Sequence, residues 1–296
     1  MSIRKAIYQI YRRFMLNHCH WKIVDREWLR WKGYKVDWAN PRDLNEKIQW
    51  LMCFSDTSMW SLCADKYRVR DYVKAKGLGD MLVPLYGVWD RAGEVDFDAL
   101  PDKFVLKCNH DSGSTVIVDK AVGFDEKAVR RSLAAHLRLR YGYAHGEMYY
   151  NDIRPCILAE KYLEPESEVS SSQVDYKIWC FDGKPYSILT CHGRTGDSVC
   201  LNVYDLDWNV HPECSVFSEH YRDGKGVLPR PAHLKEMLSA ASVLSEGFPE
   251  VRVDFYEVGG KVYFGELTFS SLCGKMTYYT DDYLRELGGQ CRLPRR

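Results

Sequence analysis

The sequence predicts an α+β protein, and three observations lead to that prediction. The first hundred residues have helical patterns, β-like runs separated by turn signals dominate from residue 103 onward, and strands and helices follow no regular alternation. A doubly wound sheet would show such an alternation. With 296 residues, 46% of them hydrophobic and 28% charged, the chain is long enough for two ordinary domains or one large one.

The N-terminal segment IRKAIYQIYRRFM predicts a helix with an apolar stripe and a basic back. The stripe consists of Ile3, Ile7, Ile10, Tyr11 and Met15. Residues 1–35 carry nine lysines and arginines but only two acids, although the whole chain has 41 residues of each sign. The segment is too short and too charged for a secretory signal or a membrane-spanning helix. Two interpretations stay open: the stripe packs on its own domain, or the helix rests on an anionic membrane surface.

Further elements follow in order along the chain. In PRDLNEKIQWLMCF, Asn40 or Asp43 is suited to cap a helix that continues through Phe54. DKYRVRDYVKAKG predicts a second helix, which Gly77 closes, and LVPLYGVWD resembles a short strand. ESEVSSSQ (166–173) has no apolar anchors and is predicted to be a loop or lid.

The β-rich part carries eight predicted strands and two helices. The strands are expected at 103–108, 115–119, 157–163, 175–181, 184–192, 200–206, 251–257 and 261–268, and the helices at 125–141 and 232–246.

Composition excludes several classes of function. Equal numbers of acids and bases give no overall field that would attract nucleic acid. The eleven cysteines are odd in number and form no CxxC, so the sequence predicts neither a disulfide framework nor a zinc site, but reduced thiols in a cytoplasm. The nine histidines form no HExxH, so any metal is expected on carboxylates. Neither a P-loop nor a Rossmann glycine motif occurs.

Four stretches could carry chemistry, and the first two concern a nucleotide. In KFVLKCNHDSGSTVIV, Lys107 precedes a hydroxyl-rich loop that contains Gly113. The backbone N–H groups of this loop, together with the charge of Lys107, could hold a phosphate. An ordinary hairpin with a snorkelling lysine explains the pattern as well. In ILAEKYLEPESEV, a strand edge after Glu160 could pair with adenine through its main chain. An exposed Glu–Lys pair at a strand end is the simpler alternative.

The other two stretches concern phosphates and a metal. In VDYKIWCFDGKPYSI, Lys177 alternates with Asp175, as on any half-solvated sheet. In VRVDFYEVGGKVYFGELTFSS, a hairpin register can bring Asp254 and Glu266 together. Two adjacent carboxylates repel each other unless a cation lies between them, and oxygen ligands favour Mg²⁺. Alternatively, Arg252 neutralises these acids without a metal.

The order of these parts resembles the ATP-grasp superfamily, and within it the TupA-like ATP-grasp family associated with bacterial surface polysaccharide genes. The resemblance extends nearly end to end. Its segments are NPRDLNEKIQWL, DKYRVRDYVKAKG, LVPLYGVWD, FVLKCNHDSG, ILAEKYLE, DYKIWCFDGKP, YDLDWN and VDFYEVGGKVYFGELTF.

That resemblance implies an ATP-grasp fold, in which two α+β subdomains clasp ATP. By this pattern residues 101–165 form the small lid subdomain and residues 166–296 the larger subdomain with the Mg²⁺ site. Residues 1–100 form a mainly helical region that is a candidate for acceptor binding.

The resemblance also implies roles for individual residues. Lys107 and Lys177 would contact the phosphates of ATP, and Glu168, with Glu166 as second choice, would hold the ribose. Arg194 and Arg252 are the candidates that pin an acceptor carboxylate. The loop over the phosphates would use His110, Ser112, Gly113, Ser114 and Thr115, adenine would lie among Glu160, Lys161, Tyr162 and Leu163, and Mg²⁺ would bind Asp254, Glu266 and Thr268. Thr268 departs from the family pattern, which has an asparagine there.

The implied reaction is ATP-dependent amide formation through an acyl phosphate. The expected substrates are a uronic acid carboxyl of a bacterial surface glycan and an amino acid or other amine, in the cytoplasm or at the inner face of the membrane. Two rival hypotheses stay open. One is a catalytically silent ATP-grasp protein that binds glycan or nucleotide, and the other is a glycosyltransferase using Asp205 and Asp207 of YDLDW.

Overall fold

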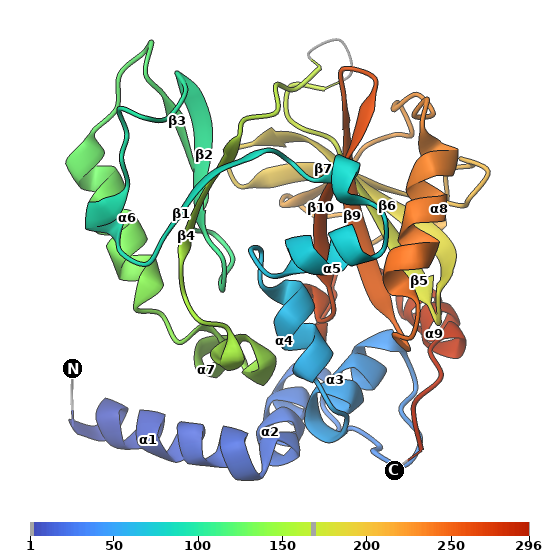
Figure 1. Cartoon of the computed structure of the whole chain (residues 1–296). Helices are drawn as coiled ribbons and strands as arrows, with labels where there is room; N and C mark the ends of the chain where they lie inside the picture. The colour runs from blue at the N-terminus through green and yellow to red at the C-terminus, as the bar shows by residue number, and fades with distance from the viewer. Residues whose placement is uncertain (1–2, 167–169, 296) are drawn as a thin grey trace.

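The computed structural model describes residues 3–166 and 170–295 (Figure 1). The N-terminal part is helical, as predicted, with α1 (Ile3–His18), α2 (His20–Lys32), α3 (Leu44–Phe54), α4 (Ser58–Ala64) and α5 (Val69–Ala75). Asp43 is the cap of α3, because its carboxylate accepts the N–H of Glu46 at 2.8 Å while the Glu46 side chain accepts the N–H of Arg42 at 2.8 Å. The cap fixes where α3 begins.

The second predicted helix is shorter than its pattern. It begins at Val69 because the carboxylate of Asp65 accepts the N–H groups of Tyr67 and Arg68, at 2.9 and 3.2 Å, and folds the preceding residues into a turn. Gly77 follows the helix with a φ of +78°, the left-handed conformation that favours glycine.

A four-stranded antiparallel sheet forms the smaller layer, at the left of Figure 1. Its order is β1 (Leu85–Trp89), β4 (Ile157–Lys161), β2 (Lys103–Cys108) and β3 (Val116–Asp119). Phe104 and Leu106 face α6 (Glu126–Leu137) and pack with Leu133. Because side chains alternate along a strand, Val105 and Lys107 point to the other face, toward the larger sheet.

The larger sheet has six strands, and its order places the C-terminal hairpin beside β5. That order is β10 (Lys261–Thr268), β9 (Val251–Val258), β5 (Asp175–Phe181), β6 (Lys184–Thr195), β7 (Ser198–Tyr204) and β8 (Tyr221–Asp223). Only the pairing of β7 with β8 is parallel among the strands described. Two more helices, α8 (Leu234–Ser245) and α9 (Asp281–Gln290), complete this part, and α8 contacts β5, β6 and β9.

Some predicted element limits differ from the structure. The helix expected over 125–141 ends at Leu137, and α7 (Tyr141–His145) is a separate helix. At Gly142 an added Cβ would lie 2.6 Å from the carbonyl oxygen of Glu147, so a glycine is needed where α7 packs closely on the next segment. The strand expected over 157–163 ends at Lys161, which frees the next residues from the sheet.

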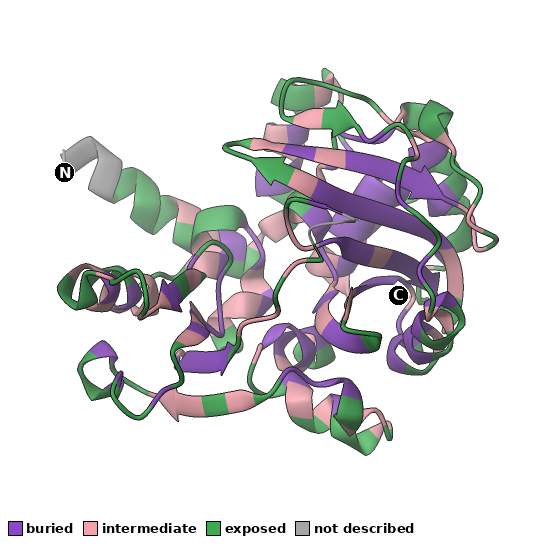
Figure 2. Cartoon of the chain, turned by 90° about the horizontal axis from the view of Figure 1, so that it is seen from above, coloured by how far each residue is buried: buried purple, intermediate pink, exposed green. Residues whose placement is uncertain are grey.

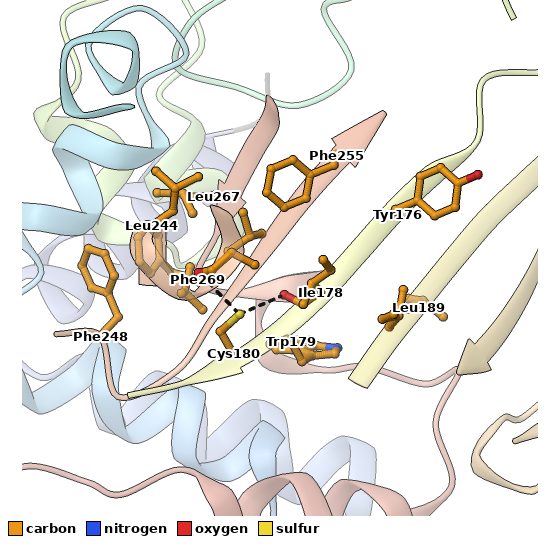
Figure 3. Close-up of a cluster of buried hydrophobic side chains, with 14 of the residues drawn as sticks. Tyr176, Ile178, Trp179, Cys180, Leu189, Leu244, Phe248, Phe255, Leu267 and Phe269 are labelled. Atoms are coloured by element: carbon orange, nitrogen blue, oxygen red, sulfur yellow. Dashed lines mark hydrogen bonds between the residues drawn. The ribbon is translucent and has the colours of Figure 1, made fainter. Parts of the chain in front are cut away.

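The main core packs against the central strands of the larger sheet (Figure 3). Ile178, Trp179 and Phe255 are fully buried, and Cys180 donates weakly to the carbonyl oxygens of Ile178 and Ala241, each at 3.8 Å. Each such apolar side chain contributes about 1.5–3 kcal/mol by leaving water. Lys177 and Asp254 are adjacent in sequence to core residues of β5 and β9, so the packing of those residues positions them.

Two sequence expectations concern the whole chain. All eleven cysteines are free of disulfide bonds. Within the described ranges, no helix has the length and apolar character needed to cross a membrane.

Candidate active site

The two sheets enclose a cavity of about 540 Å³. The small sheet contributes Val105, Lys107 and Ile117, and the large sheet contributes Asp175 and Tyr256. The segments before β1 and after β4, the loop between β2 and β3, and further residues of β4, β6 and β10 complete the lining, namely Lys66, Val69, Arg70, Leu82, Val83, Thr115, Glu160, Lys161, Tyr162, Leu163, Pro165, Ser171, Ser172, Gln173, Arg194, Phe264 and Gly265. The site therefore combines segments from Lys66 to Gly265 that are far apart in the sequence.

One part of the cavity is apolar and suits a planar base. Val105 and Ile117 are register partners on the small sheet, and Phe264 lies on the large one. Apolar walls with a few polar groups at their edge are typical of a ligand pocket.

The end of β4 provides the polar edge of this apolar part. The N–H of Lys161 donates to the carbonyl oxygen of Pro84 at 2.9 Å, so its amide is already used within the protein. Tyr162 and Leu163 follow outside the strand and also line the cavity. Main-chain recognition of a base here would use the carbonyl of Lys161 and the amides beyond it.

Glu160 is buried and is paired with two cations. Its carboxylate lies 2.5 Å from the Nζ of Lys107 and 3.3 Å from a guanidinium nitrogen of Arg70. The structure thus joins Lys107 and Glu160, two predicted nucleotide residues, in one ion-paired group. A bound phosphate would share Lys107 with this carboxylate.

The loop between β2 and β3 turns part of its polar side chains inward. Ser114 accepts the N–H of Cys108 at 2.9 Å and donates to Asp111 at 2.6 Å. His110 is only 2% exposed, with its Nε2 3.3 Å from the carbonyl oxygen of Leu139. Ser112 and Gly113 are exposed, and Thr115 is the member of the predicted set that lines the cavity. The loop therefore offers an anion its backbone and Thr115 more than its buried side chains.

Asp254 and Glu266 are directly opposite each other on β9 and β10, with a register shift next to Gly265. Asp254 is 1% exposed, and Arg252 donates to both of its oxygens, at 2.7 and 2.8 Å. Lys177 contacts the same carboxylate at 2.5 Å. Burial alone would raise the pKa of Asp254, but Arg252 and Lys177 lower it, so the acid is ionised.

Lys177 lies between two acids. Its Nζ is 3.5 Å from Asp175 as well as 2.5 Å from Asp254. Burial would lower the pKa of this lysine, but the two carboxylates outweigh burial and raise it, so Lys177 stays protonated. Asp175 also accepts a hydrogen bond from Arg194 at 2.6 Å, which links Arg194 to this cluster.

The oxygen donors fit Mg²⁺ in kind, although they are few. The Glu266 side chain is 46% exposed, and its Oε1 accepts the hydroxyl of Thr268 at 2.9 Å. Carboxylate and hydroxyl oxygens are ligands that Mg²⁺ accepts. In the part of the chain that the structure describes, no group of three or more His, Cys, Asp or Glu side chains could hold a metal. A magnesium ion on Asp254 and Glu266 would thus need phosphate oxygens and water to complete its shell.

Sequence reasoning missed Lys66 and Arg70. Both line the cavity, and Lys66 donates to the carbonyl oxygen of Asp111 at 2.5 Å. Burial lowers the pKa of Lys66, while Glu266 raises it and Lys107 lowers it. The two residues are four apart in DKYRVR, a spacing that places both on one side of a helical turn. That spacing is the available signal in the sequence, although α5 begins only at Val69 and Lys66 lies in the turn before it.

The two predicted ribose residues fall in different positions. Glu168 lies outside the described residues. Glu166 accepts the N–H of Gly259 at 2.8 Å and so contacts the turn between β9 and β10.

Asp205, the first acid of YDLDW, accepts the N–H groups of Asp207 and Asn209 at 2.9 and 2.8 Å, which is the bonding of a closed turn.

Several solved structures resemble this chain at low identity. One is the D-alanine–D-alanine ligase from Bacillus anthracis complexed with ATP, with 18% identity, a TM-score of 0.42, and coverage of 77% of this chain and 60% of that one. Another is the ATP-grasp ligase PsnB complexed with a phosphomimetic variant of its minimal precursor, Mg and ADP, with 13% identity, a TM-score of 0.42, and coverage of 99% and 76%. The chain spans about 60% of the length of the Bacillus ligase. No curated protein matches it.

The model of the TupA-like ATP-grasp family matches residues 46–292, which include every described residue of the cavity wall. The α+β architecture with its two sheets is accordingly an ATP-grasp fold, as the sequence predicted. By this match over most of its length, the protein belongs to the TupA-like ATP-grasp family.

Proposed function

We propose that this protein is an ATP-dependent ligase that joins a carboxylate to an amine through an acyl phosphate. The observation that carries the proposal is that the opposed acids Asp254 and Glu266 lie on β9 and β10, the strands that bring Tyr256 and Gly265 to the wall of the cavity, and that the same wall contains Lys66 and Lys107. Phosphoryl transfer requires positioning and charge stabilisation more than a nucleophilic side chain.

The proposed reaction has two steps. A carboxylate oxygen of the acid attacks the γ-phosphorus of ATP and ADP leaves, which gives an acyl phosphate. The amine then attacks the acyl carbon, phosphate leaves with that carboxylate oxygen, and the amine loses a proton. Mg²⁺ on Asp254 and Glu266 would supply neutralisation of the phosphate charge.

The chain's own cations hold the reacting groups in this proposal. Lys107, Lys177 and Lys66 bind phosphate oxygens, and the loop around Thr115 offers backbone amides to them. Adenine occupies the apolar part of the cavity, against the main chain of Lys161 and Leu163. When ATP binds, oxygens of its triphosphate would replace Glu160 as the partner of Lys107 and Asp254 as the partner of Lys177.

The acceptor carboxylate is assigned to an arginine. Arg194 lines the cavity and has a 51% exposed side chain, so it can reach an incoming acid. Arg252 is buried and already donates to Asp254, so its guanidinium is less free to bind an incoming carboxylate. Arg194 is therefore the first choice and Arg252 the second.

We further propose that the acid is a uronic acid of a bacterial surface glycan and the amine an amino acid or other amine. The support is the family's association with surface polysaccharide genes together with the half-exposed guanidinium of Arg194 in the cavity wall. ATP as co-substrate implies a cytoplasmic reaction. In this proposal residues 101–165 act as the lid subdomain and residues 166–296 as the subdomain with the Mg²⁺ site.

An oxygen-isotope experiment tests the reaction directly. The chain is incubated with Mg·ATP, an amine and glucuronic acid or a glucuronoside labelled with ¹⁸O in its carboxylate. One labelled oxygen is expected in the released phosphate, with a product whose mass equals acid plus amine less water. Phosphate release without label, at normal product formation, would rule out the acyl phosphate.

A catalytically silent nucleotide or glycan binder is the second candidate. It is favoured by Thr268 in place of asparagine and by Lys177 and Arg252, which already pair with the carboxylate of Asp254. Nucleotide binding without any ADP release across a panel of uronic acids and amines would favour this candidate over the ligase.

A further inference from the structure

Helix α1 leaves an apolar stripe uncovered. Ile7, Ile10, Tyr11 and Phe14 follow the i, i+3, i+4, i+7 spacing of one helix face, and they are 61, 69, 48 and 58% exposed. Four large apolar side chains in one row form a patch, not isolated surface residues. Figure 2 shows α1 reaching out from the body of the molecule with most of its described surface exposed.

The opposite face of α1 is the one that packs on the protein. Leu16 is 3% exposed, and Arg12 donates to the carbonyl oxygen of Tyr143 and lies 3.8 Å from Glu27. These contacts fix the rotation of the helix about its axis. The stripe therefore points away from the protein because the other face is anchored, and the expectation that Ile7, Ile10 and Tyr11 pack on their own domain is not met.

The surroundings of the stripe are basic, and the local acids are already used. Glu27 is paired with Arg12 and Lys275, and Asp25 accepts the indole N–H of Trp38 at 3.0 Å. Four exposed cations in α1, α2 and the segment after them have no ion pair within the described part of the chain, namely Arg13, Lys22, Arg30 and Lys35. The chain as a whole is neutral, so this end carries positive charge against the rest.

Aromatic residues accompany the cations. Trp21 at the start of α2 is 36% exposed with the Lys22 ammonium 5.3 Å from its ring, and Arg26 donates to the hydroxyl of Tyr8 at 3.2 Å. An apolar helix face with aromatic and cationic residues at its margin is the composition of helices that lie in a membrane interface.

We propose that α1 and the start of α2 dock this protein on a membrane surface that contains anionic phospholipid. Apolar side chains of the stripe would enter the headgroup boundary, and the unpaired cations would contact lipid phosphates. A second copy of the chain is the less favoured occupant, because two such surfaces would bring like charges together. The proposal is independent of the ligase reaction, since none of these residues lines the active-site cavity.

Vesicle flotation of the full chain tests the proposal. Vesicles of phosphatidylcholine alone are compared with vesicles of equal parts phosphatidylcholine and phosphatidylglycerol. We expect flotation only with the anionic vesicles, and a loss of flotation as salt rises, because salt screens the cations. The double variant Ile10→Glu/Phe14→Glu should need at least about tenfold more anionic lipid for half-maximal binding.

Matched controls separate docking from altered folding. Val122→Glu places a single glutamate at an apolar residue elsewhere that is 83% exposed, and it should float like the wild type. All three substituted side chains are exposed, so the thermal midpoints should agree. No flotation with anionic vesicles, equal flotation with both lipids, or a wild-type dimer that the double variant dissociates without any vesicle binding would each overturn the proposal.

Discussion

At the scale of single residues, Asp254 has the most demanding position in the molecule. It is 1% exposed and shares its charge with Arg252 and Lys177. The charge of a buried carboxylate with two cationic partners is neutralised, but removing that charge leaves both cations buried without this counter-ion. The same residue thus serves the fold and, in the proposed reaction, the metal.

Substitutions of the two acids should therefore differ in their effect on stability. Asp254→Asn is expected to lower the free energy of unfolding by about 3–5 kcal/mol, as for a broken buried ion pair. Glu266→Gln should cost less than about 1 kcal/mol, because that side chain is 46% exposed. Both should abolish ADP release. Urea titration compares the two stabilities, and equal losses would contradict the ion-paired role of Asp254.

Glu250 allows a prediction of pH dependence. It is 0% exposed, and neither of its carboxylate oxygens has a hydrogen-bond partner among the residues described. Burial raises its pKa well above the ordinary value of 4.5, although Arg252 opposes this. The folded state therefore keeps a proton that the unfolded state loses. Its stabilising effect is complete below the unfolded pKa and is lost as pH rises toward the folded pKa, by up to about 1.4 kcal/mol per pH unit.

Glu250→Gln should remove this dependence. The variant is expected to gain stability over the wild type progressively as pH rises from about 5 to about 8. Thermal midpoints measured across that range check the prediction. Two parallel curves would mean that Glu250 does not titrate between the folded and unfolded states.

At the scale of elements, the segment after β10 stores strain beside the proposed metal site. Leu272 and Cys273 have φ values of +47° and +54°, which cost roughly 1–2 kcal/mol each for residues other than glycine. Gln49 on α3 donates to the carbonyl oxygen of Cys273 at 2.6 Å, and Arg252 donates to Ser271 at 2.7 Å. Such strain persists because the surrounding contacts impose it, and it is common near active sites.

Leu272→Gly should relieve part of this strain. Its side chain is 46% exposed, so little burial is lost, and a gain of about 1 kcal/mol in the free energy of unfolding is expected. Leu139 is a matched control, because it is 43% exposed and does not have a positive φ. Leu139→Gly should not stabilise the protein. Equal effects of the two substitutions in urea titrations would show that the strain at Leu272 is negligible.

Much of the element pattern could be predicted from the sequence because local rules decide it. The limits of β2, β5 and β10 agree with the alternation of their side chains, and the Asp43 cap fixes the start of α3. The part played by Lys66 could not be found this way, since only the fold places it at the cavity. Nor does a helical stripe in α1 reveal whether other residues cover it.

At the scale of the whole molecule, the site exists only where the two sheets and the N-terminal helices meet. Lys107 and Glu160 belong to the small sheet, Lys177 and Asp254 to the large one, and Lys66 to the helical part. Each segment alone has a plain structural explanation. Lys66, Lys107 and Glu160 line one cavity within the matched family region, and Lys177 and Asp254 join it through Asp175, which supports joint binding of a nucleotide and a metal.

The most direct test of this convergence is the affinity for ATP measured by calorimetry with and without Mg²⁺. The wild-type chain should bind ATP at least about tenfold more tightly with Mg²⁺, because the ion joins the triphosphate to the acids. Glu266→Gln should lose that gain while it still binds ATP weakly through the lysines. If Mg²⁺ does not change the affinity of the wild type, or strengthens binding equally in the variant, the proposed metal-bridged site is contradicted.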